Sequence, residues 1–433
     1  MPSHTTHNTP ALRFPGYIGV WEQQRFHELA LVRRGLTYKP SDVHTSGIRV
    51  LRSSNIVEET FTTSPDDIFV QDNAINIPFI HNGDILVTAA NGSSRLVGKH
   101  AIVRNLLKNS AVPGGFMLCL SSPEPDFLNA SMSSSWYSKF IHVFVAGGNG
   151  SIGNISKSSL DMQPVLVPSL PEQQKIGSFF HHVDDLINLH QRQTQKLTEL
   201  KQGLLQNMFP REGESVPRLR FPGFTTTWKQ QKFKDTFTMM QNNTLSRADL
   251  NNESGNAYDI HYGDILTIFN EYLDVTKQKL PYINANASFN TQKYSQSALQ
   301  NGDVIMADTA EDTTVGKCVE ITGVSDDTPV FAGLHTIPLR SSHNFGPGYL
   351  AYYLNSAAYH DQLYPFIQGI KVDSIGKSAL QMTTIMFPSS YDEQKQIGSF
   401  FRTLDDLLAL HEQYTVKLIH LKKGLLQKMF PQD

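Results

Sequence analysis

The 433 residues provide enough chain for about three compact domains, and their 18% charged and 10% aromatic content excludes an acidic disordered chain or a basic tail. The net charge of -3 excludes a global attraction to nucleic acid, so any such surface must be local. Cys119 and Cys318 lie far apart, which excludes a disulfide framework and a thiolate metal site of the usual spacing. We expect a cytoplasmic protein without a membrane span, because residues 1–10 lack a signal-peptide pattern and no apolar run approaches ~20 residues.

The chain contains an internal repeat. The segment LRFPG at 12–16, followed by Trp21, returns as LRFPG at 219–223, followed by Trp228. A longer segment at 172–210 returns at 393–431. Between these landmarks the match is thin but ordered, as in GDIL at 83–86 against GDVI at 302–305. Similar ends with unlike middles predict two related scaffolds that carry different surfaces.

The middle of each copy has the composition of a mixed domain. Short β-branched or alternating segments broken by Gly, Asn and Asp predict strands at 48–56, 84–88, 115–120, 258–266 and 330–339. Helices are expected around 131–145 and 348–366. The predicted fold class is therefore α+β, with two tandem domains at 1–170 and 211–391, a central helix at 171–210 and a C-terminal helix at 392–433.

Both long helices show apolar positions that alternate in steps of three and four, which is the spacing of a coiled-coil seam. Pro171 suits a helix start, and Pro210 and Pro431 cannot continue a helix. We predict that the two helices pair antiparallel, while the neighbouring Phe180, Ile187, Phe401 and Leu408 pack against the domains or a partner protein. The predicted seam comprises Ile176, Phe179, Val183, Leu186, His190, Leu197, Leu200 and Leu204, with Ile397, Phe400, Leu404, Leu407, His411, Leu418, Leu421 and Leu425.

Two duplicated polar features of these helices invite a chemical interpretation. His190 and His411 share one heptad position, where a register-setting polar layer or a position beside a partner is favoured over a metal site. We predict no metal site. The acidic pairs at 184–185 and 405–406 favour solvated helix faces or partner contacts over catalytic carboxylates, because no further acid or base accompanies them.

The sequence contains no recognisable catalytic motif. Gly148, Gly150 and Gly153 spell G-x-G-x-x-G, but the segment lacks the flanking strand and helix of a nucleotide site and favours a loop. A P-loop lysine motif, H-E-x-x-H, G-x-S-x-G, C-x-x-C and the [ND]-P-P-[FY] tetrapeptide of amino-methyltransferases are all absent from the sequence. We therefore predict that the chain is not itself an enzyme.

Taken together, the duplicated motifs resemble the specificity subunit of type I restriction-modification enzymes. The resemblance rests on the LRFPG openings with their tryptophans, on E-Q-x-x-I-G at 172–177 and 393–398, and on G-L-L-Q-x-M-F-P at 203–210 and 424–431. It implies that each middle is a target-recognition domain for one half of a bipartite double-stranded DNA sequence and that the helices set the gap. It also implies two methyltransferase subunits that use S-adenosylmethionine, and two restriction or translocase subunits that use ATP and Mg, in a system for phage defence.

On this interpretation, local cations and amides at turns and strand ends are the candidate DNA contacts. Amide and guanidinium groups can hydrogen-bond base edges in the major groove. The candidates are Arg33, Arg34, Lys39, Arg52, Asn55, Arg95 and Lys99 in the first copy, and Asn242, Asn243, Arg247, His261, Tyr262, Lys317 and Lys371 in the second.

Two alternatives stay open. The first is a stand-alone DNA methyltransferase, which S-adenosylmethionine binding by the purified chain would support. The second is a coiled-coil scaffold that binds only proteins, whose association would be insensitive to salt, in contrast to DNA binding.

Overall fold

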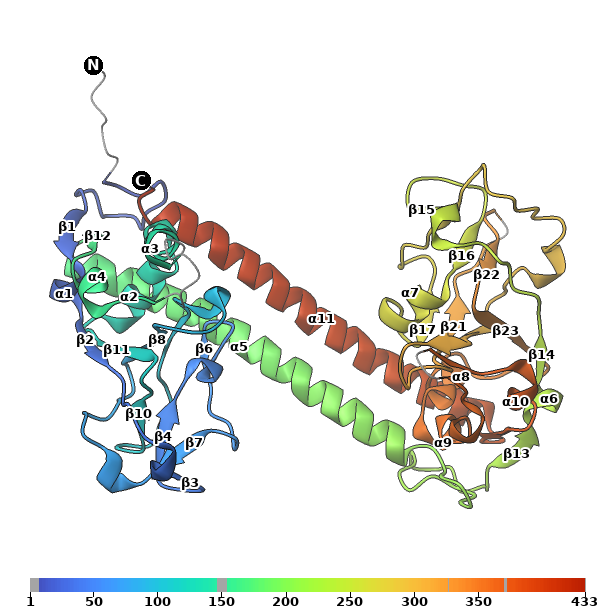
Figure 1. Ribbon diagram of the computed structural model, residues 1–433. Coiled ribbons are helices and arrows are strands. Elements are labelled where there is room, and N and C mark those ends of the chain that lie inside the picture. The colour runs from blue at the N-terminus through green and yellow to red at the C-terminus, as the bar shows by residue number, and fades with distance from the viewer. Residues whose placement is uncertain (1–7, 146–153, 326, 370–371, 433) are drawn as a thin grey trace. The chain divides into compact units, whose positions relative to one another are not determined.

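The computed structural model describes residues 8–145, 154–325, 327–369 and 372–432 (Figure 1). The chain divides into two compact units, unit 1 with Met1–His190 and Gln413–Asp433, and unit 2 with Gln191–Glu412. The division falls within the two long helices, α5 (Leu170–Asn207) and α11 (Tyr391–Met429). The glycine motif at 148–153 and Lys371 lie outside the described residues.

Unit 1 is built on two four-stranded sheets. The first has the order β2-β11-β8-β9 and is antiparallel throughout, and the second has the order β10-β4-β7-β3, in which β4 and β10 run parallel. Short ribbons β1-β12 and β5-β6 complete it. The strands are β1 Glu22–Arg25, β2 Leu31–Arg34, β3 Val43–His44, β4 Ile48–Leu51, β5 Ile56–Val57, β6 Thr60–Phe61, β7 Ile68–Val70, β8 Ile85–Thr88, β9 His100–Ile102, β10 Ala111–Pro113, β11 Met117–Ser121 and β12 Pro164–Val167. The short helices are α1 Phe26–Leu29, α2 Pro125–Met132, α3 Ser135–Val145 and α4 Lys157–Asp161.

Unit 2 repeats this topology. Its first sheet has the order β14-β23-β19-β21-β17, and its second has the order β15-β18-β16-β22, in which β16 and β22 run parallel. Ribbons β13-β25 and β20-β24 complete the unit. The strands are β13 Lys229–Lys232, β14 Phe237–Met239, β15 Leu250–Asn251, β16 Tyr258–Ile260, β17 Tyr272–Asp274, β18 Tyr282–Ile283, β19 Val304–Ala307, β20 Thr309–Ala310, β21 Cys318–Thr322, β22 Val330–Ala332, β23 Thr336–Ser341, β24 Asp373–Ser374 and β25 Thr384–Phe387. The helices are α6 Phe233–Thr236, α7 Tyr262–Thr267, α8 Tyr349–Leu354, α9 Ala357–His360 and α10 Lys377–Leu380.

The α+β class predicted from the sequence is confirmed, and two local predictions are wrong. The strand expected at 258–266 ends at Ile260, because His261 caps helix α7 by accepting a hydrogen bond from the backbone N–H of Gly263 (3.2 Å). The strand expected at 330–339 is interrupted at His335, whose φ of 57° breaks the extended backbone between β22 and β23. None of the helices in the described residues is long and apolar enough to cross a membrane.

The duplicated openings fasten each unit to its long-helix segments. In unit 1 the Arg13 guanidinium donates two hydrogen bonds to the buried Glu172 carboxylate (2.6 Å each), and the rings of Phe14 and Phe179 meet edge to face. Unit 2 repeats both contacts, with Arg220 on Glu393 (2.6 and 2.8 Å) and Phe221 on Phe400. The repeated motif is therefore a structural clamp, because a fully buried carboxylate requires a charged partner.

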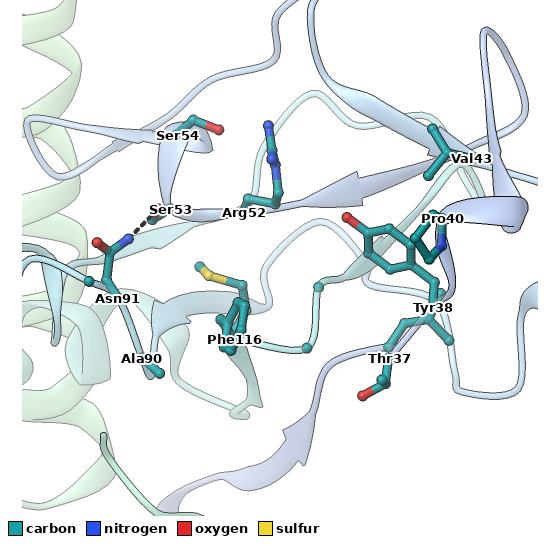
Figure 2. Close-up of a pocket in the computed structure, with 15 residues that line it drawn as sticks. Thr37, Tyr38, Pro40, Val43, Arg52, Ser53, Ser54, Ala90, Asn91 and Phe116 are labelled. Atoms are coloured by element: carbon teal, nitrogen blue, oxygen red, sulfur yellow. Dashed lines mark hydrogen bonds between the residues drawn. The ribbon is translucent and has the colours of Figure 1, made fainter. Parts of the chain in front are cut away.

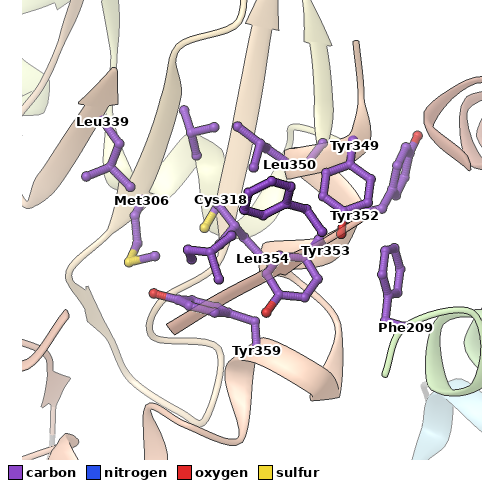
Figure 3. Packing of buried hydrophobic residues seen from close by; sticks show 14 of the residues in the cluster. Phe209, Met306, Cys318, Leu339, Tyr349, Leu350, Tyr352, Tyr353, Leu354 and Tyr359 are labelled. Carbon is purple, nitrogen blue, oxygen red and sulfur yellow. The ribbon is translucent and has the colours of Figure 1, made fainter. Parts of the chain in front are cut away.

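The ends of the long helices complete the cores. In unit 1, Phe430 packs against Trp21 and Phe180. In unit 2, Phe209 takes the same place against Trp228 and Phe401. Figure 3 shows Phe209 beside the tyrosines of α8 and α9 in the largest hydrophobic cluster of that unit. Each core thus contains an M-F-P motif that follows a long helix, which explains why this motif is written twice.

The predicted seam needs correction. Leu186, Leu200, Leu407 and Leu421 are exposed by 46, 49, 39 and 52%. The buried residues of α5 are instead spaced as Ile176, Phe180, Val183 and Ile187, and α11 begins the same way with Ile397, Phe401 and Leu404. A strict seam assumes that only another helix covers the helix, whereas each helix segment here also packs on a globular domain, which moves the buried face toward the positions expected to flank it.

Candidate functional site

The first candidate site lies where four strands of unit 1 end at one edge. The residues after β2, β4, β8 and β10 line a cavity of 930 Å³. Figure 2 shows Tyr38, Arg52, Asn91 and Phe116 around this space. Strands that point the same way bring their following loops together, and such loops carry binding residues on a rigid scaffold. The cavity is therefore the site in unit 1 at which we expect a ligand to be recognised.

Arg52 stands on a rigid base at this edge. Its backbone N–H donates to Oδ1 of Asn55 (2.8 Å), and Nδ2 of Asn55 donates to the Thr62 carbonyl (3.0 Å) and to Oδ1 of Asp67 (2.8 Å). Asn55 is buried, so its amide serves the fold and we leave it out of the proposed contact surface. The Arg52 side chain is exposed, and its guanidinium has no hydrogen-bond or ion-pair partner among the described residues.

The wall of the cavity is mainly apolar. Tyr38, Phe116 and Met117 face it, and Phe116 is 71% exposed. Asn91 is held in place, because its Nδ2 donates to Ser53 Oγ (3.0 Å) and its Oδ1 accepts the backbone N–H of Ser93 (3.0 Å). Sequence reasoning missed Tyr38 and Phe116, since their types alone do not distinguish a cavity wall from a core.

The other candidate cations of unit 1 divide into two groups. The Arg33 guanidinium donates to Asp84 Oδ2 (2.9 Å) and Ser121 Oγ (3.0 Å), so it belongs to an interior ion pair around the duplicated Gly-Asp motif. Arg340 repeats this pairing on Asp303 in unit 2. The remaining candidates are exposed and have no ion pair among the described residues: Arg34, Lys39, Arg95 and Lys99.

Unit 2 places different side chains at the equivalent edge. His261 follows β16, Asp308 follows β19 and His335 follows β22. His335 Nδ1 lies 3.3 Å from Asp308 Oδ1, and the Tyr262 ring stands between the imidazoles of His261 (4.7 Å) and His335 (5.3 Å). Sequence reasoning selected His261 and Tyr262 but missed Asp308 and His335, although Asp308 follows the duplicated Gly-Asp strand.

Several polar groups in unit 2 are occupied by the fold. Asn242 Nδ2 donates to the Gly333 carbonyl (3.2 Å), and the buried Asn243 donates to Asp259 Oδ2 (2.6 Å). Arg247 pairs with Asp264 (2.6 Å), and the Lys317 ammonium donates to the Leu266 carbonyl (3.2 Å). These contacts commit the four side chains to structural partners: Asn242, Asn243, Arg247 and Lys317.

Burial shifts the ionisation of this edge. Burial lowers the pKa of His261, which keeps its imidazole neutral at physiological pH and able to accept the Gly263 N–H. Burial also raises the pKa of Asp259 to about 7, against the opposing effect of the hydrogen bond from Asn243. The edge of unit 2 therefore contains few fixed positive charges, in contrast to the edge that presents Arg52.

The acidic pairs of the long helices correct another expectation. In unit 1 Lys422 bridges Asp184 and Glu59 (2.8 Å each), and in unit 2 Lys201 bridges Asp405 (2.6 Å) and Glu271 (2.9 Å). The first aspartate of each pair thus joins a three-member ion pair and not a solvated face, because the facing helix segment supplies a lysine. Among the described residues, no three His, Cys, Asp or Glu side chains are grouped so as to hold a metal. His190 stacks on Tyr414 instead (5.1 Å).

Comparisons with known proteins give the family. The profile of the type I restriction modification DNA specificity domain matches residues 20–199 and 226–419. The chain therefore belongs to this family, which is a family of DNA-binding proteins, and the resemblance seen in the sequence is confirmed.

Individual relatives carry the same description. The chain is 27% identical over 197 residues to the type I restriction enzyme StySPI specificity subunit of Salmonella potsdam, a match that covers 43% of this chain and 42% of that protein. It is 27% identical over 241 residues to the EcoKI specificity subunit of Escherichia coli (strain K12), covering 52% and 50%. The chain thus spans about half the length of these curated relatives. Among solved structures, the S subunit of a type I restriction-modification system from M. genitalium has a similar fold, with a TM-score of 0.58 at 12% identity over 98% of this chain and 100% of that one.

Proposed function

We propose that this chain is the DNA-specificity subunit of a type I restriction-modification complex, in which each unit recognises one half of a bipartite DNA sequence. One observation carries the proposal: the two units share a strand topology yet present different side chains at the same strand ends, Arg52 in one and His261 in the other. Two unlike half-sites require this combination, because base edges differ in their donors and acceptors while the scaffold need not change.

In the proposal, α5 and α11 form one continuous antiparallel pair that fixes the gap between the half-sites. Contacts inside each unit support the direction of pairing, since Asp184 faces Lys422 in unit 1 and Lys201 faces Asp405 in unit 2. Helices of 38 and 39 residues would each extend about 57 Å at 1.5 Å per residue. Such a length exceeds one turn of DNA, about 34 Å, and suits two recognition surfaces on one duplex.

The exposed apolar residues of the long helices support a protein partner. Leu189, Leu410, Val416 and Ile419 are 42–52% exposed on helices that otherwise carry polar surfaces. Apolar side chains gathered on a helix mark an interaction site. We assign this surface to two methyltransferase subunits, which would supply S-adenosylmethionine and the methylation chemistry. Restriction subunits with ATP and Mg would complete the assembly, and this chain would contribute recognition without catalysis.

The proposal is tested by exchanging residues 22–160 for the corresponding segment of another family member. Genome-wide mapping of methylated adenines should then show that one half of the methylated sequence changes while the other half and the gap are retained. A change in both halves, or in neither, would contradict two independent recognition domains. A coiled-coil scaffold without DNA recognition predicts instead that the complex binds DNA no better than its methyltransferase subunits alone, at any salt concentration.

A further inference from the structure

Arg52 is distinct among the cations of unit 1 because of its place in the cavity. It is the only charged side chain among the described residues that line the 930 Å³ space. The exposed Arg34, Arg95 and Lys99 do not line it. An exposed cation on a convex surface suits a phosphate, which carries no sequence information, whereas a cation inside a concave wall can be reached only by a group that enters.

The position of Arg52 is fixed while its guanidinium stays available. Asn55 and Asp67 hold the backbone at the end of β4, and Asp67 also accepts the Arg49 guanidinium and the backbone N–H of Ser64 (2.9 Å). A network of this kind prevents the strand end from moving toward a weakly bound ligand. The side chain therefore presents its donors from a rigid platform, with only its own rotamers left to order.

The chemistry of guanidinium restricts what it can recognise. Its five N–H groups are donors in a planar fork and it has no acceptor. In the major groove guanine presents two acceptors, O6 and N7, to such a fork, whereas adenine N6 and cytosine N4 are themselves donors and oppose it. Tyr38, Phe116 and Met117 form an apolar wall that excludes water, which strengthens a well-formed hydrogen bond and penalises an unmatched one.

Unit 2 does not repeat this arrangement. At the equivalent strand end stands His261, which is 8% exposed and whose Nδ1 accepts the backbone N–H of Gly263. The nearest exposed polar groups there, Asp308 and His335, contact each other. On the basis of the proposed function, we propose that Arg52 recognises a guanine in the half-site of unit 1, and that no cation equivalent to Arg52 contacts a base in the half-site of unit 2.

The test uses the chain in its complete methyltransferase complex. Methylated adenines are mapped in cells with wild type, R52A and R95A, and the exchange of residues 22–160 assigns one half-site to unit 1. We expect that half-site to contain a guanine whose requirement is relaxed by R52A, with the other half-site unchanged. R95A serves as the matched control, since Arg95 is an exposed arginine of the same unit outside the cavity, and it should leave both halves intact.

A binding measurement covers the case in which R52A abolishes methylation altogether. The purified complex is titrated with oligonucleotides that carry guanine or 7-deazaguanine, which lacks the N7 acceptor, at the assigned position. Wild type should lose about 10- to 100-fold in affinity on this replacement, in the range of one bidentate base contact, and R52A should lose little more. R52A should keep the melting temperature of wild type, because its side chain has no partner to lose.

The outcomes separate the two proposals. A wild-type half-site without guanine, an unchanged consensus in R52A, or equal affinity losses for every sequence would overturn the role of Arg52 and leave the specificity-subunit proposal intact. The absence of any bipartite methylated sequence in wild type would instead overturn the proposed function itself.

Discussion

Two glycines in the long helices of unit 2 should respond in opposite ways to the same substitution. Gly398 belongs to α11, and a Cβ added there would lie 2.2 Å from the Pro347 carbonyl oxygen and 3.0 Å from the Tyr349 nitrogen. These are backbone atoms that cannot rotate away. Gly203 belongs to α5, and a Cβ added there would meet nothing within 4 Å. We therefore predict that G398A destabilises unit 2 and that G203A stabilises it.

The magnitudes follow from the surroundings. Overpacking against a rigid neighbour costs about 1–3 kcal/mol, whereas replacing an unhindered helical glycine by alanine gains about 1 kcal/mol. The two variants should thus differ by about 3 kcal/mol in the free energy of unfolding. For a unit of this size, 1 kcal/mol corresponds to about 2–4 °C in Tm, so the melting temperatures should be about 6–12 °C apart.

The assay is thermal unfolding combined with hydrogen exchange, which assigns the change to unit 2. Unit 1 offers a matched pair, because a Cβ at Gly177 would lie 2.7 Å from the Phe127 nitrogen while Gly424 has free space. G177A and G424A should therefore repeat the opposite signs in unit 1. Equal effects of G398A and G203A would refute the close approach of the α11 backbone to the loop before α8.

Three further predictions concern charge in unit 2. K201M should cost about 3–5 kcal/mol at neutral pH, because it leaves the buried Asp405 carboxylate without its cation, and adding D405N should recover part of the lost Tm. Burial raises the pKa of Glu320 to about 7, so its stabilising contribution is complete below about pH 4.5 and is lost as the pH rises to about 7. The difference in Tm between E320Q and wild type should therefore shift in favour of E320Q from pH 5 to pH 8, by on the order of 3 kcal/mol, and a pH-independent difference would contradict the assignment. D308N should change the methylated sequence only in the half-site of unit 2, which mapping of methylated adenines can check, and a change in the other half would count against it.

Much of the architecture could be predicted from the sequence because it is written in local or repeated signals. The proline-bounded runs at 172–210 and 393–431 identify the long helices, since helix starts and stops depend on a few neighbouring residues. The repeated LRFPG and M-F-P motifs indicate two related units, and their divergent middles indicate different surfaces. The family followed from the same motifs, because their combination along the chain is specific even though each motif alone is short.

The sites could not be predicted at the same level, because sequence position does not reveal which donors are already used. Arg33 and Arg52 are alike in sequence, yet Asp84 binds the first and only the second lines a cavity. The buried face of α5 also differs from its heptad pattern, because Phe180 and Ile187 turn toward a domain core and not only toward a helix. The sequence by itself determined the elements, the repeat and the family. Only the tertiary structure decided which charges are paired and which remain free, because pairing depends on residues that are distant along the chain and meet only when it folds.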